Sequence, residues 1–241
     1  MCSSDLVGPS GKVFAYEPQG VIAALLRRNV AQNGLAHVEV REAVLGRAPG
    51  SLRVPELDYR TVENFGGLSL SAERGLEVPV ETIDGLNLSR VDLIKADVEG
   101  MEIEVLEGAA ESIRRLRPVL YVENNRDDRS KALIATIFGF GYRAWWYTAP
   151  LFNADNHAKQ THNVFGDTIS INMFCFPKEL EIDVGGGVPV ISEDDTRDAA
   201  GARVRARLEQ RRQLAPGSPP PPTTPPPPQG GGSGRKKRRG R

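Results

Sequence analysis

Two stretches of the sequence decide its fold: Gly11-Lys12-Val13-Phe14-Ala15-Tyr16-Glu17-Pro18 and Val91-Asp92-Leu93-Ile94-Lys95-Ala96-Asp97-Val98-Glu99-Gly100. Each stretch is a short apolar run that ends in acidic residues and is followed by a helical pattern. In open α/β sheets, ligands bind at the carboxyl ends of such strands. Carboxylates at these positions can bind ribose hydroxyls, accept a proton or hold a metal ion. The two stretches therefore indicate an α/β fold with a candidate site at the ends of two strands.

Strand and helix patterns alternate along most of the chain. After the first strand, Ile22, Leu25, Leu26 and Val30 form a helical stripe, and Gly34 is a stop signal. This alternating order is typical of a doubly wound, mostly parallel sheet. We expect strands at residues 12–16, 37–44, 52–54, 78–80, 93–94, 119–122, 142–147 and 169–176, and helices at 18–33, 101–116 and 130–138.

The composition is that of an ordinary globular protein. The 241 residues, of which 39% are hydrophobic, suffice for one domain with a core and tails. No apolar run reaches the ~18 residues that a transmembrane helix needs, and residues 1–5 lack the basic and apolar regions of a signal peptide. Only Cys2 and Cys175 are present, which excludes a disulfide framework and a cysteine zinc site. We therefore expect a cytoplasmic protein without a membrane segment.

The net charge of zero hides an uneven distribution. Residues 201–241 hold 11 Lys and Arg and a single acid, whereas residues 1–200 hold 20 basic and 30 acidic residues. An acidic body argues against nucleic-acid binding by the folded part, so only the basic C-terminus could attract nucleic acid, without sequence specificity. We expect a partial domain at 1–180 and a disordered Pro/Gly-rich tail at 181–241 with a basic C-terminus.

The two stretches resemble methyltransferases of the FkbM family. The segment Ile94-Lys95-Ala96-Asp97-Val98-Glu99-Gly100-Met101-Glu102 matches the family's most distinctive motif almost in full, with Ala96 where an isoleucine or another apolar residue is commoner. Phe14-Ala15-Tyr16-Glu17-Pro18 also resembles the family, and the resemblance runs to about Phe176. It implies a class I methyltransferase with a Rossmann-like sheet, S-adenosylmethionine as the cofactor and a hydroxyl oxygen as the methyl acceptor.

The opening of the family's fold has no counterpart in residues 1–10. The family usually begins with a strand and an Asp-Val-Gly-Ala-Asn-like turn, which none of these residues match. We expect an N-terminally truncated sheet that lacks its first strand and glycine-rich turn. Two central strands would then lack a partner or pair with each other. Because the turn holds the methionine end of the cofactor in this family, we also expect weak or undetectable cofactor binding and poor solubility.

Three residues are candidates for binding the nucleoside part of the cofactor. Glu17 ends the first strand, where a carboxylate can accept hydrogen bonds from both ribose hydroxyls. The alternative is an exposed acid that the helix N-terminus favours, and the resemblance favours the cofactor. Glu42 and Ala43 end the 37–44 strand, at a corner that lies near the adenine in this fold. An ordinary loop acid is an equal alternative for Glu42.

The second stretch carries the candidate catalytic residues. Lys95, Asp97 and Glu99 occupy alternate positions, so they share one side if the chain stays extended as far as Glu99. Asp97 and Glu99 are the predicted catalytic pair, and Asp97 is also a candidate for cofactor binding. Their carboxylates could orient an acceptor hydroxyl, take its proton or hold a divalent ion, although we assign no metal-binding residue. The alternative is that Lys95 pairs with Asp97 and that Glu99 caps the next helix.

The substrate candidates follow the next strand at the same edge. Glu123 and Asn124 end the 119–122 strand and could line a pocket for a small molecule with a hydroxyl group, with a loop cap as the alternative. A weaker match to a loop near the family's site comprises Asn64, Gly66, Gly67 and Ser69.

The resemblance to the FkbM family implies transfer of a methyl group from S-adenosylmethionine to a hydroxyl on a sugar, a polyketide or another secondary metabolite. A Rossmann dehydrogenase, which also has an acid after its second strand, is one alternative. The other is an inactive remnant domain whose basic tail binds nucleic acid without specificity. Asp97-Val98-Glu99-Gly100 favours the methyltransferase over the dehydrogenase.

Overall fold

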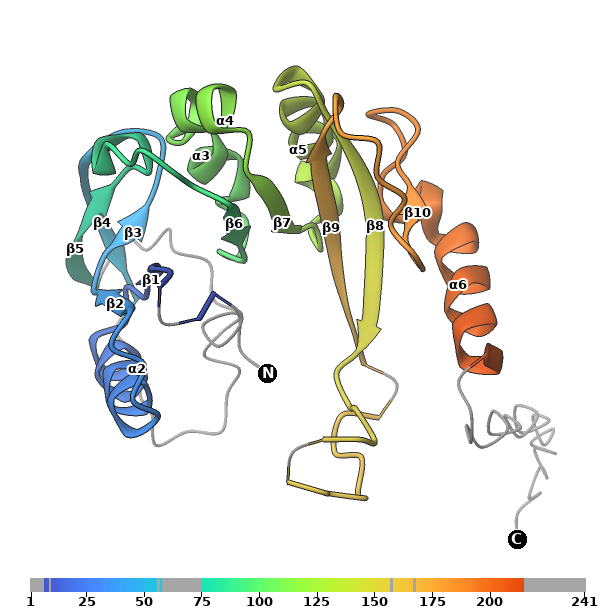
Figure 1. Cartoon of the computed structure of the whole chain (residues 1–241), viewed down its shortest axis with the longest axis horizontal. Helices are drawn as coiled ribbons and strands as arrows, with labels where there is room; N and C mark the ends of the chain where they lie inside the picture. Colours follow the sequence, from blue (N-terminus) through green and yellow to red (C-terminus); the bar gives the residue numbers. More distant parts are fainter. Residues whose placement is uncertain are drawn as a thin grey trace, which may run out of the picture.

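The computed structural model describes residues 7, 8, 10–55, 57, 75–156, 158–166 and 168–214. Strands and helices alternate along these residues (Figure 1). The strands are β1 (Val13–Tyr16), β2 (Val38–Arg41), β3 (Val44–Leu45), β4 (Gly50–Val54), β5 (Leu76–Glu81), β6 (Leu93–Ala96), β7 (Val119–Glu123), β8 (Tyr142–Pro150), β9 (Ile169–Pro177) and β10 (Val188–Pro189). The helices are α2 (Gly20–Gln32), α3 (Glu102–Glu107), α4 (Ala110–Leu116), α5 (Asp127–Gly139) and α6 (Arg197–Leu214), with a short 3-10 turn, η1, at Asp84–Leu86.

The described strands form three sheets. β1 and β2 pair in parallel, and β6 and β7 pair in parallel within a sheet ordered β10-β8-β9-β7-β6. The third sheet has the order β3-β5-β4. Helix α2 links β1 to β2, and α3 and α4 link β6 to β7, as parallel neighbours require a crossover. The predicted α/β class is therefore confirmed.

The strand pairing is more mixed than the mostly parallel sheet that we expected. β9 pairs antiparallel with both β7 and β8, and β10 pairs antiparallel with β8. β8 and β9 form a long hairpin in which Tyr142 lies opposite Pro177 (Figure 1). The sequence between them holds no crossover helix among its described residues, and strands joined in this way pair antiparallel. The apolar residues that predicted both strands carry no information on their direction.

β1 and β6 belong to different sheets and do not pair with each other. Among the described strands, β1 pairs with β2 alone and β6 pairs with β7 alone. One edge of each strand therefore has no ladder partner within the described part of the chain. Leu93, at the start of β6, is 46% exposed, whereas Ile94 and Ala96 are buried.

The main hydrophobic core joins the five-stranded sheet to α3, α4 and α5. Complete burial of one large apolar side chain stabilises the folded state by roughly 1.5–3 kcal/mol. Fully buried residues of β7 and β9 pack in this core. The carboxyl ends of β6 and β7 therefore lie next to tightly packed residues. The largest fully buried side chains of this core include Leu106, Ile113, Leu120, Ile134, Ile137, Trp146 and Met173.

The helix expected at 101–116 is two short helices, α3 and α4, that meet at Gly108. A Cβ atom on Gly108 would lie 1.9 Å from the carbonyl oxygen of Gly46, so no other residue fits without a shift of the backbone. The carbonyl of Gly108 accepts the amide of Asp84 at 3.0 Å. The Asp84 carboxylate in turn accepts the amide of Glu111 at 2.9 Å, at the start of α4. These contacts with distant loops divide the helix, which helical periodicity alone does not reveal.

The packed part of the chain extends beyond the boundary at residue 180 that we expected. Val188, Val190 and Ala200 belong to the main core. Trp146 Nε1 donates to the carbonyl of Asp195 at 3.1 Å. A disordered tail from residue 181 is therefore wrong for β10 and α6, while the residues after 214 lie outside the described chain. Neither α6 nor another helix in the described ranges is long and apolar enough to cross a membrane.

Candidate functional site

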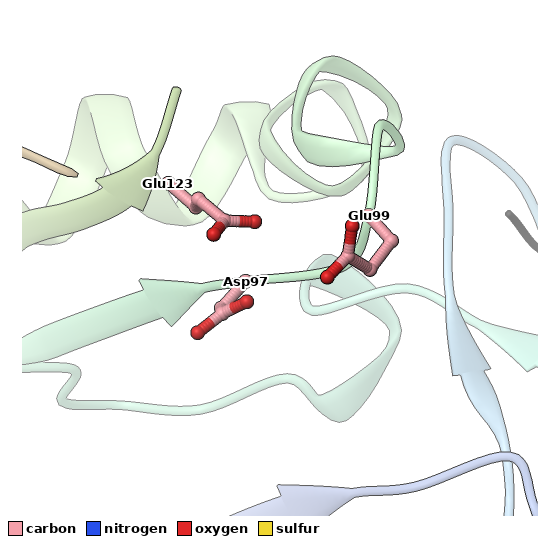
Figure 2. Close-up of side chains that lie close together, drawn as sticks. All are labelled: Asp97, Glu99 and Glu123. Carbon is pink, nitrogen blue, oxygen red and sulfur yellow. The ribbon is translucent and has the colours of Figure 1, made fainter. Parts of the chain in front are cut away.

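Three acidic side chains meet where β6 and β7 end. The register of the two strands places Ala96 opposite Val122, so Asp97 comes to lie beside Glu123. Glu99 joins them from the turn after β6. One carboxylate oxygen from each of the three acids lies within 4.8 Å of the other two, and Figure 2 shows the three side chains gathered at the strand ends. The structure thus brings together the predicted catalytic pair and one of the predicted acceptor-binding residues.

The backbone conformation that brings Glu99 into this cluster differs from the extended one that we expected. β6 ends at Ala96, and Glu99 has a left-handed backbone with φ of 51°, so the extended alternation stops before it. Lys95 Nζ donates to Asp97 Oδ2 at 2.9 Å, as in the alternative interpretation. The other half of that alternative is wrong, because α3 begins at Glu102 and its N-cap residue is Met101, with no side-chain cap hydrogen bond.

The turn that carries Glu99 is held by Glu102, which was not among our candidates. Glu102 Oε1 accepts the backbone amides of Val98 and Gly100 at 3.3 and 3.0 Å. The residue is only 6% exposed. Glu102 is the last residue of the motif in the sequence, but nothing there indicates that its side chain folds back onto the turn.

Arg126 lies against the same turn. A Cβ atom on Gly100 would lie 2.8 Å from Arg126 Nε and 3.0 Å from Arg126 Cδ, so the glycine leaves room for the arginine. Gly100 has φ of 100°, which also favours glycine. Arg126 Nη2 lies 4.0 Å from Glu99 Oε2. A cation from the β7–α5 connection therefore neighbours the acidic cluster, and no sequence pattern indicated it.

The cluster strongly changes the acidity of Glu123. Burial, followed by the negative charges of Asp97 and Glu99, raises the pKa of Glu123 to about 7. Burial and then the charge of Asp97 raise the pKa of Glu99, and Arg126 offsets part of this rise. Glu123 Oε2 is buried and accepts no hydrogen bond from a described donor. A proton on Glu123 would let it donate a hydrogen bond to Asp97, which contributes to the raised pKa of Glu123.

This arrangement supports two kinds of chemistry. A carboxyl group with a pKa near the working pH can take a proton from a bound hydroxyl and release it again. Three converging carboxylates could instead hold a divalent cation, for which carboxylate oxygens are suitable ligands. In both cases the groups involved are Asp97, Glu99 and Glu123.

Asn124 does not belong to the cluster, although we expected it to line the acceptor pocket. It is 3% exposed, and its side-chain amide donates to Met173 Sδ at 3.5 Å. Its backbone amide donates to the carbonyl of Ile171 at 3.2 Å. Asn124 therefore faces the packed interior beside β9, a strand that follows much later in the sequence.

Two of the candidates for nucleoside binding, Glu17 and Glu42, lie at the start of α2. Glu17 Oε1 accepts the backbone amide of the residue just before α2 at 2.8 Å. Glu42 Oε1 would lie 2.8 Å from a Cβ atom on Gly20, and Glu42 Oε2 pairs with Arg27 at 3.3 Å. Ala43, the next residue, is 1% exposed. The helix-terminus contact considered for Glu17 is present, and it engages only one of the two carboxylate oxygens in the described contacts.

The environment of Glu17 is that of a half-buried acid. Burial raises its pKa, and the hydrogen bond from the backbone amide offsets part of this rise.

A cavity of about 440 Å³ at the other end of α2 is lined by Val30, Leu35, Val38, Val40 and neighbours, and contains no candidate site residue. The weaker loop match at Asn64, Gly66, Gly67 and Ser69 lies outside the described residues.

The comparison with protein families agrees with the strand-end motifs. Residues 2–144 match the family model described as the methyltransferase FkbM domain. Because this match covers more than half of the chain, the protein belongs to the FkbM methyltransferase domain family. No curated protein matches the chain.

Two solved structures are similar to the chain at low sequence identity. A methyltransferase FkbM from Methylobacillus flagellatus KT is 18% identical with a TM-score of 0.42, over 68% of this chain and 36% of that one. A precorrin-6y C5,15-methyltransferase from Geobacter metallireducens GS-15 is 14% identical with a TM-score of 0.43, over 70% of this chain and 68% of that one. This chain thus spans little more than a third of the first structure's length.

Proposed function

We propose that this chain transfers a methyl group from S-adenosylmethionine to a hydroxyl oxygen of a small molecule, such as a sugar, a polyketide or another secondary metabolite. Family membership supports methyl transfer. The observation that carries the oxygen acceptor is the convergence of Asp97, Glu99 and Glu123 within 4.8 Å, with the pKa of Glu123 raised to about 7. A hydroxyl must lose a proton as it is methylated, and this cluster can receive it. A cytoplasmic location is part of the same proposal.

The chain's own task is to position the acceptor and to receive its proton. A well-placed general base contributes roughly 10²–10⁴-fold to such a reaction. In our proposal Asp97 and Glu99 orient the hydroxyl, and its proton comes to rest between Asp97 and Glu123. Lys95, at 2.9 Å from Asp97, holds that carboxylate in place. Correct placement of the two reactants supplies the rest of the rate enhancement.

The residues at the start of α2 fit the nucleoside part of the cofactor. Glu17 uses one oxygen for a backbone amide, and its second oxygen can accept a ribose hydroxyl. In our proposal Glu42 accepts from an amino group of the adenine ring, and Ala43 is the next residue at the same corner. When bound, S-adenosylmethionine supplies the electrophilic methyl group.

A transfer assay tests this proposal. The full chain is incubated with methyl-labelled S-adenosylmethionine at millimolar concentration and with a panel of sugars and polyketide alcohols. The matched controls are the same compounds with the hydroxyl replaced by hydrogen. Label in the hydroxyl compounds alone supports the proposal, whereas label in amine or carbon acceptors alone contradicts the oxygen assignment. Reduction of NAD by the same alcohols without methyl transfer would favour the dehydrogenase.

A further inference from the structure

The turn at residues 98–100 has a backbone conformation that ordinary residues disfavour. Glu99 lies in the left-handed region with φ of 51°, where the Cβ atom of an L-residue comes close to the backbone. Gly100 follows with φ of 100°. Such a conformation persists only when the surroundings hold it. If Glu99 adopted the negative φ that L-residues prefer, its side chain would point away from Asp97.

Glu102 makes the contacts that can hold this turn. Its single carboxylate oxygen, Oε1, bridges the amides on either side of Glu99, at 3.3 Å from Val98 N and 3.0 Å from Gly100 N. Because both amides point at one buried atom, the 97–98 and 99–100 peptide groups, which flank the peptide between Val98 and Glu99, cannot rotate independently. At 6% exposure, Glu102 is shielded from water that could replace these bonds.

From these contacts we propose that Glu102 is a positioning residue, whose buried carboxylate fixes the 98–100 turn so that Glu99 is held against Asp97 and Glu123. Its connection with catalysis rests on the proposed function of the acidic cluster. The positioning itself depends only on the two hydrogen bonds to the turn and on the backbone conformation of Glu99.

Two substitutions of Glu102 separate positioning from general stability. Glu102→Gln keeps an oxygen at the position of Oε1 and should preserve both hydrogen bonds, although it removes the charge. Glu102→Ala removes the acceptor. Glu104→Ala is the matched control, because it removes a carboxylate from the same helix, where it pairs with Arg129 at 2.7 Å.

The test uses nuclear magnetic resonance of the full chain. Hydrogen exchange of the Val98 and Gly100 amides reports the two bonds, and the coupling between the amide and α protons of Glu99 reports its φ. We expect the wild type, Glu102→Gln and Glu104→Ala to agree in both measurements. Glu102→Ala should exchange both amides roughly tenfold faster or more and move Glu99 to negative φ. If Glu102→Ala melts at a lower temperature but keeps the wild-type coupling at Glu99, the role is structural and the proposal fails.

A milder substitution keeps the test decisive if Glu102→Ala does not fold. Glu102→Asp retains the charge but withdraws the carboxylate by one methylene, so it should release the Gly100 amide and alter the φ of Glu99. Wild-type exchange and coupling in Glu102→Asp would overturn the proposal. None of these measurements needs a cofactor or an acceptor, so an absence of methyl transfer in the wild type would count against the proposed function alone.

Discussion

Asp97 and Glu123 lie beside each other at the ends of two parallel strands, in a register set by Ala96 and Val122. Glu123 is partly buried, and the charge of Asp97 adds to the effect of burial, so the pKa of Glu123 rises to about 7. A carboxyl group that is half protonated near neutral pH is suited to proton transfer. The pairing of β6 with β7 therefore creates a chemical property that neither residue would have alone.

Removing the charge of Glu123 should stabilise the protein at alkaline pH. Its pKa rises from 4.5 to about 7, so the folded state holds the proton more tightly than the unfolded state does. The resulting stabilisation is complete below pH 4.5 and is lost as the pH rises through about 7. After allowance for solvent screening, we expect Glu123→Gln to raise the free energy of unfolding by roughly 1–2 kcal/mol at pH 8, and by much less at pH 5.

Urea unfolding of both proteins between pH 5 and pH 8 measures this difference. Glu111→Gln is the control, because Glu111 is an exposed carboxylate outside the cluster. Parallel pH dependence of the wild type and Glu123→Gln would show that Glu123 titrates normally.

Asp97 and Glu99 should be needed for methyl transfer. The double variant Asp97→Asn, Glu99→Gln keeps the size of both side chains and removes the charges, so we expect the initial rate to fall roughly 10²–10⁴-fold. Asp92→Asn is the control, since Asp92 precedes the same strand and pairs with Arg90 at 2.9 Å. A double variant with the turnover of the wild type would remove both residues from the catalytic role.

The unit formed by β1, α2 and β2 should open more readily than the five-stranded sheet. In the described structure, neither hydrophobic core cluster includes a residue from these three elements. Every residue of β1 and β2 is only partly buried, whereas Leu120 and Val122 in β7 are fully buried. We expect the hydrogen-bonded amides of β1 and β2 to exchange at least roughly tenfold faster than those of β7. Equal protection would indicate one cooperative unit.

A chain that ends after Leu214 should lose any salt-sensitive binding of DNA. Residues 235–241 hold six Lys and Arg, and the shortened chain keeps β10 and α6. Non-specific binding through such a run weakens steeply as the salt concentration rises. Fluorescence anisotropy with duplex DNA at two salt concentrations measures this for both chains. If the shortened chain binds as tightly as the full chain, the basic run is not responsible.

The strand ends could be predicted from sequence because their signals are local. An apolar run followed by acids located Asp97 and Glu123, and the alternation of strands and helices implied that the two strands are parallel neighbours. Parallel neighbours end at the same edge of a sheet, so the convergence of these two carboxylates followed from the pattern.

The remaining features depend on contacts between segments that are distant in sequence or on backbone torsions. The burial of Asn124 was not predicted, because it depends on β9, which comes from residues after 168. The left-handed Glu99 and the buried Glu102 depend on torsions that residue types alone do not specify. The break in the predicted helix at Gly108 needs the carbonyl of Gly46, which a periodicity argument cannot place.

We propose that this chain binds S-adenosylmethionine weakly, between the start of α2 and the ends of β6 and β7. Amide chemical shifts detect weak binding, so the most direct measurement is a titration of the full chain with S-adenosylhomocysteine, followed by the same titration with NAD. We predict that S-adenosylhomocysteine shifts the amides of Glu17, Glu42, Ala43 and Asp97, that Glu17→Gln weakens this response, and that NAD produces none. Shifts at these residues with NAD and none with S-adenosylhomocysteine would show that they bind a dinucleotide and not the methyltransferase cofactor.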